Sequence, residues 1–183
     1  MSDTPPSAAS LADLAAAQAK KGKGPPPVHL WDPPHTGDID IRIARDGTWF
    51  HEGTVIEREA LVRLFASILK REGDRHFLVT PVEKVGIVVE DAPFLAIDME
   101  RGDDALTFET NVGDRVTAGP ENAIRVEEDL ETGEPSPYLH VRRGLEARID
   151  RKTFYRLAEI AEEEGGRFVV RSRGAAFDIG PAA

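Results

Sequence analysis

The stretch 80–94, TPVEKVGIVVEDAPF, is the densest apolar run in this sequence and constrains the fold more than any other segment. Val85, Ile87 and Val89 alternate with residues of which one is also apolar, so the predicted strand has one fully apolar face and a second that is half apolar. A strand of this kind belongs in the centre of a sheet. Pro81 and a later Asp-Ala-Pro turn limit the strand, because proline has no amide hydrogen to donate to a neighbouring strand.

The segment before this run has the pattern of a small α+β unit. Ile39, Ile41 and Ile43 form one side of a strand, and an Asp-Gly pair predicts the hairpin turn that follows it. Apolar side chains at helical spacing then predict a helix over about residues 57–72, closed by Gly73.

The last segment repeats this order. Two predicted strands turn at Arg143-Gly144, and an apolar stripe at helical spacing predicts a helix that Asp150 caps and Gly165-Gly166 ends. At a constant offset of 93 residues, Gly73 falls on Gly166, and other matches lie at equivalent structural points. The alternative is that any two amphipathic helices that follow hairpins look alike.

The repeated pattern predicts an α+β fold of duplicated strand-strand-helix-strand units with a mostly antiparallel sheet. Residues 1–27 are predicted to be a disordered tail, because they are rich in Ala, Pro, Ser, Lys and Gly and hold few large apolar groups. Residues 28–80 are predicted to form an N-terminal α+β domain, and residues 81–183 a C-terminal β-rich domain with one helix. Two packed halves also predict a cleft where polar groups converge.

Composition and charge narrow the classes of function. The sequence has no cysteine, which excludes disulfides, thiolate-bound zinc and a cysteine nucleophile. The N-terminus lacks the pattern of a signal peptide and no segment is apolar enough to span a bilayer, so we expect a cytoplasmic protein without a membrane partner. The net charge of −10, concentrated in the second half, disfavours nucleic acid as a partner.

The sequence lacks the short motifs that mark common enzymes. It contains no GxSxG, no Walker loop, no GxGxxG after a strand and no HExxH. The five histidines lack the spacing of metal ligands, and the paired carboxylates are most simply the polar faces of strands and turns. We therefore predict no catalytic residue and no metal site, and the sequence identifies no cofactor.

Arginine supplies 17 of the 23 cationic residues, and several cations lie on predicted strands near aromatic groups. Arginine forks beside a flat ring suit a phosphate joined to a base or another ring. On this basis the predicted ligand-binding residues are Asp40, Arg42, Trp49, Lys84, Arg125, Tyr138 and Arg142. Two alternatives stay open: the cations form ion pairs with Asp38, Asp40, Glu83 or Glu127, and the arginine excess reflects genome composition.

Five segments of the sequence carry a resemblance to a known family. They are LWDPPHTGDIDIRIARDGTWF, ALVRLFASILKREGD, LVTPVEKVGIVVEDAPF, NAIRVEED and PSPYLHVRRGLEARIDRKTFYRLAE, and the resemblance as a whole extends over residues 30–179. Through them the chain resembles the bacterial domain-of-unknown-function family 1285. The resemblance implies a duplicated α+β fold whose C-terminal half is similar to a pleckstrin-homology barrel. It also implies a nucleotide-like ligand at the interface of the halves and a role in signalling, and it defines no activity and no catalytic residue.

Three functions are consistent with the sequence. The first is a non-enzymatic sensor that binds a small anionic, nucleotide-type ligand between the two halves and acts with a signalling protein. The second is a protein-interaction module that presents a sheet edge or an acidic surface, including the acidic loop at residues 127–134, to a basic partner. The third is an enzyme that uses dispersed carboxylates, an arginine and a divalent metal on a phosphorylated substrate.

Overall fold

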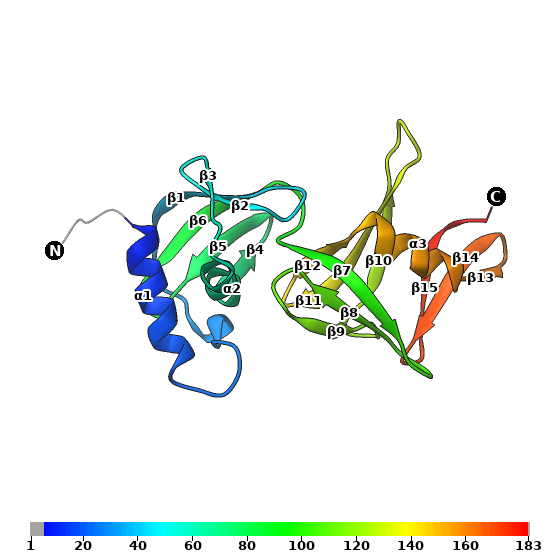
Figure 1. Ribbon diagram of the computed structural model, residues 1–183, viewed down its shortest axis with the longest axis horizontal. Coiled ribbons are helices and arrows are strands. Elements are labelled where there is room, and N and C mark those ends of the chain that lie inside the picture. The colour runs from blue at the N-terminus through cyan, green and yellow to red at the C-terminus, as the bar shows by residue number, and fades with distance from the viewer. Residues whose placement is uncertain (1–5, 183) are drawn as a thin grey trace. The chain divides into compact units, whose positions relative to one another are not determined.

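The structure is a computed structural model that describes residues 6–182. Its contacts divide the chain into two compact units, Met1–Asp91 and Ala92–Ala183 (Figure 1). The elements of the first unit are α1 (Ala8–Ala19), η1 (Val28–Leu30), β1 (His35–Ile43), β2 (Trp49–His51), β3 (Thr54–Val55), α2 (Glu59–Ser67), β4 (Leu69–Glu72), β5 (Arg75–Val79) and β6 (Lys84–Val89). Those of the second unit are β7 (Phe94–Arg101), β8 (Leu106–Thr110), β9 (Arg115–Thr117), β10 (Ile124–Glu128), β11 (Pro135–Arg142), β12 (Leu145–Ile149), α3 (Arg151–Glu159), β13 (Glu162–Glu164), β14 (Arg167–Ser172) and β15 (Ala175–Pro181).

The first unit is built on one six-stranded sheet in the order β3-β2-β1-β6-β5-β4. Strand β6 runs parallel to β1 and antiparallel to β5, which confirms that the apolar run forms a central strand. One face of the sheet carries buried side chains such as Ile41, Ile43 and Val85. On β2, Trp49 stacks on Phe65 of α2 at a centroid distance of 6.3 Å, so α2 contributes to the same core.

The central strand belongs to the first unit, so the predicted division of the domains at residues 80 and 81 is wrong. Its hydrogen-bonded neighbours β1 and β5 both lie in the first unit, and the chain divides after Asp91. Pro81 lies inside the tight turn between β5 and β6, where the amide of Thr80 donates to the carbonyl of Glu83 at 2.8 Å. Proline therefore marks a turn within a sheet here, and the later Asp-Ala-Pro turn marks the boundary.

The prediction of a disordered tail over residues 1–27 is wrong for residues 8–19. Residues Ala8–Ala19 form α1, whose N-cap Ser7 accepts a hydrogen bond from the amide of Ser10. The helix packs against α2 and completely buries Leu11 and Ala15. Tertiary packing of two apolar side chains therefore orders a segment whose own amphipathic pattern is weak. Residues 1–5 of the predicted tail lie outside the described part of the chain.

The predicted helix over residues 57–72 is too long. Helix α2 ends at Ser67, and the following residues form β4, which pairs with β5 across a turn that contains Gly73 at φ 60°. The second unit follows the same order, because α3 ends at Glu159 and a hairpin of β13 and β14 comes next. Each unit thus contains a helix, a hairpin with glycine in its turn and a further strand, which supports the predicted duplication.

The second unit combines a curled six-stranded sheet, in the order β10-β11-β12-β7-β8-β9, with a three-stranded sheet, β13-β14-β15 (Figure 1). The buried hydroxyl of Ser172 on β14 links the two sheets, because it accepts from the amide of Leu106 at 2.8 Å and donates to the carbonyl of Ala118 at 2.7 Å. In the described residues each six-stranded sheet contains one parallel pair, β1 with β6 and β7 with β12, and the other pairs are antiparallel. The predicted predominance of antiparallel pairing is confirmed.

Candidate functional site

The two units divide the predicted ligand-binding residues between them. Asp40, Arg42, Trp49 and Lys84 lie in the first unit, and Arg125, Tyr138 and Arg142 lie in the second. Trp49 is a core residue, only 2% exposed, and its Nε1 has no hydrogen-bond partner among the described residues. Asp40 is exposed on β1.

Each predicted cation lies beside a carboxylate. Arg42 donates to Glu90 at 2.7 Å and Lys84 donates to Glu72 at 3.0 Å. In the second unit, Arg142 donates to Asp114 at 2.8 Å, and Arg125 makes a bidentate pair with Glu146 at 2.7 and 2.8 Å and a further contact with Glu127. Ion pairing is thus the observed state of all four predicted cations in these contacts. The partners differ from those expected, because Glu127 is the one of the four predicted carboxylates that pairs with a predicted cation here.

Lys84 belongs to a larger polar cluster on one face of the first sheet. Alternation places side chains two residues apart on the same face, and the ladder pairs Lys70 with Phe77 and Phe77 with Gly86. Charged side chains from β1, β4, β5 and β6 therefore gather around one ring. The Phe77 network, as it is called below, consists of His35, Asp38, Lys70, Glu72, Arg75, Phe77 and Lys84.

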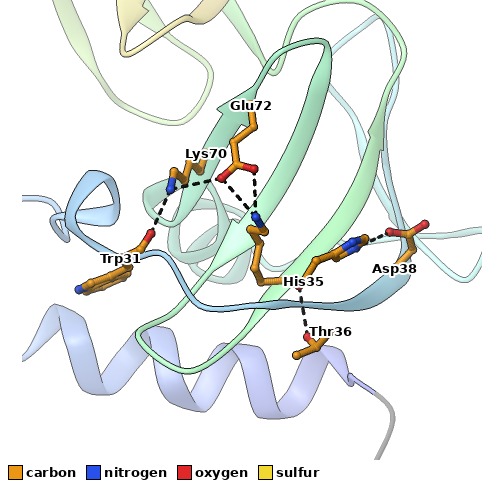
Figure 2. A network of polar contacts seen from close by, with 7 residues as sticks. Trp31, His35, Thr36, Asp38, Lys70 and Glu72 are labelled. Atoms are coloured by element: carbon orange, nitrogen blue, oxygen red, sulfur yellow. Dashed lines mark hydrogen bonds and ion pairs between the residues drawn. The ribbon is translucent and has the colours of Figure 1, made fainter.

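The first half of the Phe77 network is one carboxylate shared by two lysines. The ammonium of Lys84 lies 3.0 and 3.3 Å from the two carboxylate oxygens of Glu72, and Lys70 reaches Oε1 at 3.3 Å (Figure 2). The side chain of Lys84 is 12% exposed and that of Lys70 is 20% exposed. The hydrogen bond from Lys84, followed by that from Lys70, holds the pKa of Glu72 below its usual value.

The second half is the carboxylate of Asp38, on which His35 and Arg75 converge. His35 Nε2 lies 3.0 Å from Oδ1 of Asp38 (Figure 2). Nη2 of Arg75 donates to the same oxygen at 2.9 Å. These hydrogen bonds, with that of His35 the larger, lower the pKa of Asp38. Gly86 leaves room for the pair, because a Cβ there would lie 2.2 Å from Oδ1 of Asp38 and 2.6 Å from Nη2 of Arg75.

Phe77 joins the two halves. The guanidinium of Arg75 and the ammonium of Lys84 each lie 5.0 Å from the centroid of its ring, and the ring of His35 approaches edge-on at 5.4 Å. The ring is buried, so these contacts are partly shielded from water and the cation–π attraction is stronger than at an open surface. The network therefore holds three permanent cations and a histidine against two carboxylates.

The chain from Trp31 to Thr36, which leads into β1 and includes its first two residues, lies over this cluster (Figure 2). Lys70 donates to the backbone carbonyl of Trp31 at 3.0 Å, and the hydroxyl of Thr36 donates to the backbone carbonyl of Lys84 at 3.2 Å (Figure 2). Both lysines of the first half thus also contact this segment, one through its ammonium and one through its main chain.

The sequence predicts Lys84 as a ligand-binding residue and Asp38 as an ion-pair partner, but it does not identify the other members of the Phe77 network. Lys70 and Glu72 were assigned to the overlong helix, where side chains two residues apart point in different directions. On a strand they share a face, and the signal for a strand was the Gly73-Asp74 turn that follows them. Arg75 lay between two predicted elements, so nothing in the sequence aligned it with Asp38.

The second unit offers two cavities. The larger, of about 340 Å³, lies between β10 and β15 and includes Arg125, Arg167 and Phe177 in its lining. Arg125 stacks over the ring of Tyr138 at 4.4 Å, and the hydrogen bond with Glu146 raises the pKa of its guanidinium. Arg167 pairs with Asp178 at 2.7 Å, so carboxylates neutralise both arginines of this cavity. The smaller cavity, of about 270 Å³, is lined by both acidic and basic residues of the β7–β8 turn and the three-stranded sheet.

Residues 6–182 contain neither a membrane-spanning helix nor a cluster of metal ligands. No helix in that range has the length and apolar character needed to cross a membrane. No group of three or more His, Cys, Asp or Glu residues in it has the geometry to hold a metal ion.

Comparison with known families gives two adjacent matches. Residues 26–92 match the N-terminal domain, and residues 93–179 the C-terminal domain, of the family described as domain of unknown function DUF1285. The chain is 59% identical to a DUF1285 family protein from Silicibacter pomeroyi DSS-3 whose crystal structure is known, with a TM-score of 0.85 over 93% of this chain and 94% of that one. A DUF1285 family protein from Shewanella baltica OS155 is 32% identical, with a TM-score of 0.53 over 65% and 90% of the two chains. No curated protein matches the chain.

Proposed function

The chain belongs to the DUF1285 family, and from this premise we propose that it binds a small anionic ligand, nucleotides included, without transforming it, in the service of signal transduction. One observation carries the proposal: the three permanent cations of the Phe77 network share only two carboxylates. The network therefore keeps one positive charge in excess. In a chain of net charge −10, this is a local reversal of sign.

Burial makes the excess charge effective. Lys84 and Lys70 are mostly shielded from solvent, and the attraction between a cation and an anion grows as water is excluded around them. A surface lysine would be screened by salt and would bind a small anion weakly. The half-buried lysine pair therefore favours an anion in a way that an exposed ion pair, such as that of Arg115 with Glu100, does not.

The hydrogen-bonding capacity of the two lysines also suits a phosphate. Each ammonium carries three N–H donors, and the side-chain hydrogen bonds of Lys84 in the described structure go to the two oxygens of one carboxylate. Phosphate oxygens accept such charge-assisted hydrogen bonds. An anion beside Lys84 and Lys70 would add a third negative group to a site that now holds two, and so balance three cations.

The test is a binding measurement on the purified chain with a panel of anions. Isothermal titration with inorganic phosphate and with nucleoside mono-, di- and triphosphates should give saturable binding for at least one of them. Lys84→Met should weaken that binding at least tenfold, since it removes the more buried ammonium. Chromatography of the mixture after long incubation should recover the ligand unchanged.

A matched control separates this site from general electrostatics. Arg115→Met also removes one cation, from an exposed ion pair with Glu100 in the second unit, and should leave the affinity unchanged. If both variants weakened binding equally, or if neither did, the Phe77 network would not be the site. The location of the ligand between the two halves, and the likeness of the second unit to a pleckstrin-homology barrel, stay predictions from the family resemblance.

A second candidate function is a protein-interaction module, and the hairpin between β10 and β11 favours it. Leu130 at its tip is fully exposed and has acidic neighbours. The turn is ordered, because the carboxylate of Asp129 accepts hydrogen bonds from the amides of Glu131 and Thr132 at 2.8 and 2.9 Å. A basic protein partner that is lost on Leu130→Ser, and retained on Leu95→Ser elsewhere in the same unit, would support this function over the first.

A further inference from the structure

Residues 28–36, which we name the strap, run from η1 across the Phe77 network into the first two residues of β1, and one of these, His35, belongs to the network (Figure 2). Val28 anchors its beginning, since it is buried, and the hydroxyl of Thr36 fixes its end on the carbonyl of Lys84. Between these points the strap is held by Lys70, which donates to the carbonyl of Trp31. The side chain of Leu30, by contrast, is 72% exposed.

We propose that the strap regulates the anion site, because an anion and the carbonyl of Trp31 compete for the ammonium of Lys70. This inference rests on the proposed function. When an anion occupies the site, residues 28–32 become more mobile. Binding of a small anion thereby changes the surface of the first unit at the strap.

The competition follows from the relative strength of the two acceptors. The carbonyl of Trp31 is a neutral acceptor, whereas a phosphate oxygen carries charge, and charge-assisted hydrogen bonds are about twice as strong as neutral ones. Lys70 also contacts Glu72 at 3.3 Å, so its ammonium lies where an anion that approaches Lys84 would meet it. When Lys70 turns to the anion, the carbonyl of Trp31 loses this donor.

Apart from the hydrogen bond with Lys70, the middle of the strap is held by the buried Pro33 and by the bonds within η1. The short helix η1 is closed by the amide of Leu30 donating to Pro27 and the amide of Trp31 donating to Val28, both local bonds. Pro27 and Pro33 lie directly before and after residues 28–32 and restrict the backbone there. Loss of the hydrogen bond from Lys70 should therefore move residues 28–32 without disrupting β1. Because Thr36 is bonded to the main chain of Lys84, the end of the strap stays attached.

Thermodynamic reciprocity gives the proposal a second consequence. If anion binding loosens the strap, then loosening the strap must strengthen anion binding by the same factor. Val28→Ala weakens the buried anchor at the beginning of the strap and removes no charged group of the Phe77 network. It should therefore tighten phosphate binding several-fold.

The experiment uses the full chain with inorganic phosphate as the probe and sodium chloride of equal ionic strength as the control. Hydrogen–deuterium exchange should show faster exchange of the amides of residues 28–32 when phosphate is bound. Trp31 and Trp49 are the two tryptophans of the sequence, so in a Trp49→Phe background the emission reports on Trp31 alone. That emission should shift to longer wavelength as phosphate saturates the site. Lys70→Met should show the faster exchange without phosphate and no further response to it.

The outcomes distinguish this inference from the proposed function. Absence of phosphate and nucleotide binding would overturn the proposed function and the inference with it. Calorimetric binding with unchanged or slower exchange of residues 28–32 would overturn the inference alone, as would an affinity that Val28→Ala left the same or lowered.

Discussion

The ammonium of Lys84 on β6 lies 3.0 Å from Oε2 of Glu72, which is two strands away on β4 and on the same face of the first sheet. Only 12% of the lysine side chain is exposed. A cation this shielded depends on its carboxylate, and the same carboxylate also serves Lys70. The pair is thus both a structural element of the sheet and the source of the excess positive charge on this face. Removal of the Glu72 charge should therefore lower the stability of the fold and raise the affinity for an anion.

Glu72→Gln should lower the free energy of unfolding by about 2 kcal/mol, because it leaves two half-buried ammonium groups without a counter-charge. The same change should strengthen phosphate binding, since the competing carboxylate is gone. Urea denaturation and isothermal titration measure the two effects. Glu100→Gln, which breaks an exposed pair with Arg115 in the second unit, should change neither quantity appreciably. A Glu72→Gln protein that binds phosphate more weakly would contradict the account.

Gly86→Ala should disrupt the contact between Asp38 and Arg75. The new Cβ would lie 2.2 Å from the Asp38 oxygen and 2.6 Å from the Arg75 nitrogen, so both side chains must move away. We expect a loss of roughly 1–3 kcal/mol of unfolding free energy, in the range of other overpacked sites. Thermal denaturation checks it. Gly22→Ala is the matched control in the same unit, because a Cβ at Gly22 meets no atom within 4 Å, and equal effects of the two variants would refute this explanation.

His76 predicts a dependence of stability on pH. Burial, with a smaller effect of the Arg71 charge, lowers the pKa of His76 to about 4 from an ordinary value of 6.5, and Nε2 has no hydrogen-bond partner among the described residues. Between these two values the unfolded chain binds the proton and the folded chain does not. The free energy of unfolding should therefore fall by roughly 3 kcal/mol as the pH decreases from about 6.5 to about 4.

Urea titrations at several pH values test this sign. His76→Gln should flatten the slope over that range relative to the unsubstituted chain, whereas His51→Gln, at a half-exposed histidine, should keep it. A slope that survives in His76→Gln would show that another group is responsible.

The link between the two sheets of the second unit should depend on one hydroxyl. Ser172→Ala would leave the amide of Leu106 and the carbonyl of Ala118 without their present buried partner, at a cost of about 3 kcal/mol. Both tryptophans lie in the first unit, so circular dichroism, rather than tryptophan emission, reports on this change. Ser136→Ala on β11 is the control within the same unit. An unchanged dichroism transition in Ser172→Ala would contradict the assigned role.

The sequence predicted the elements whose pattern is local and regular. The strand with Ile41 and Ile43, the central strand with Val85 and the cap at Asp150 all have their expected form, because alternation and capping depend on near neighbours. The end of α2 was wrong because residues 69–72 continue a helical pattern and are nevertheless paired with β5. Pairing with β5 determines that residues 69–72 form a strand, and the local sequence pattern does not show this pairing.

The candidate site shows the same limit. Lys84 can be identified from the sequence because a lysine at the start of an apolar strand is conspicuous. Glu72, Lys70 and Arg75 are brought beside Lys84 and Asp38 by the register of the strands, which the sequence does not show directly. Trp49 was expected at a ligand and instead stacks on Phe65 in the core, since a ring near a hairpin packs wherever the register directs it. Register in turn depends on which strands are neighbours, and that order is a property of the whole sheet.

The most direct test of the anion site is a titration of the isotope-labelled chain with inorganic phosphate, and with the best nucleotide from the binding panel, followed by amide NMR. The account predicts that saturable shifts concentrate at residues 35–38, 70–77 and 84–86 and at the strap, and that they disappear in Lys84→Met. Shifts confined to the second unit, around Arg125 and Tyr138, or no saturable shift with any anion, would contradict the claim that the Phe77 network binds an anion.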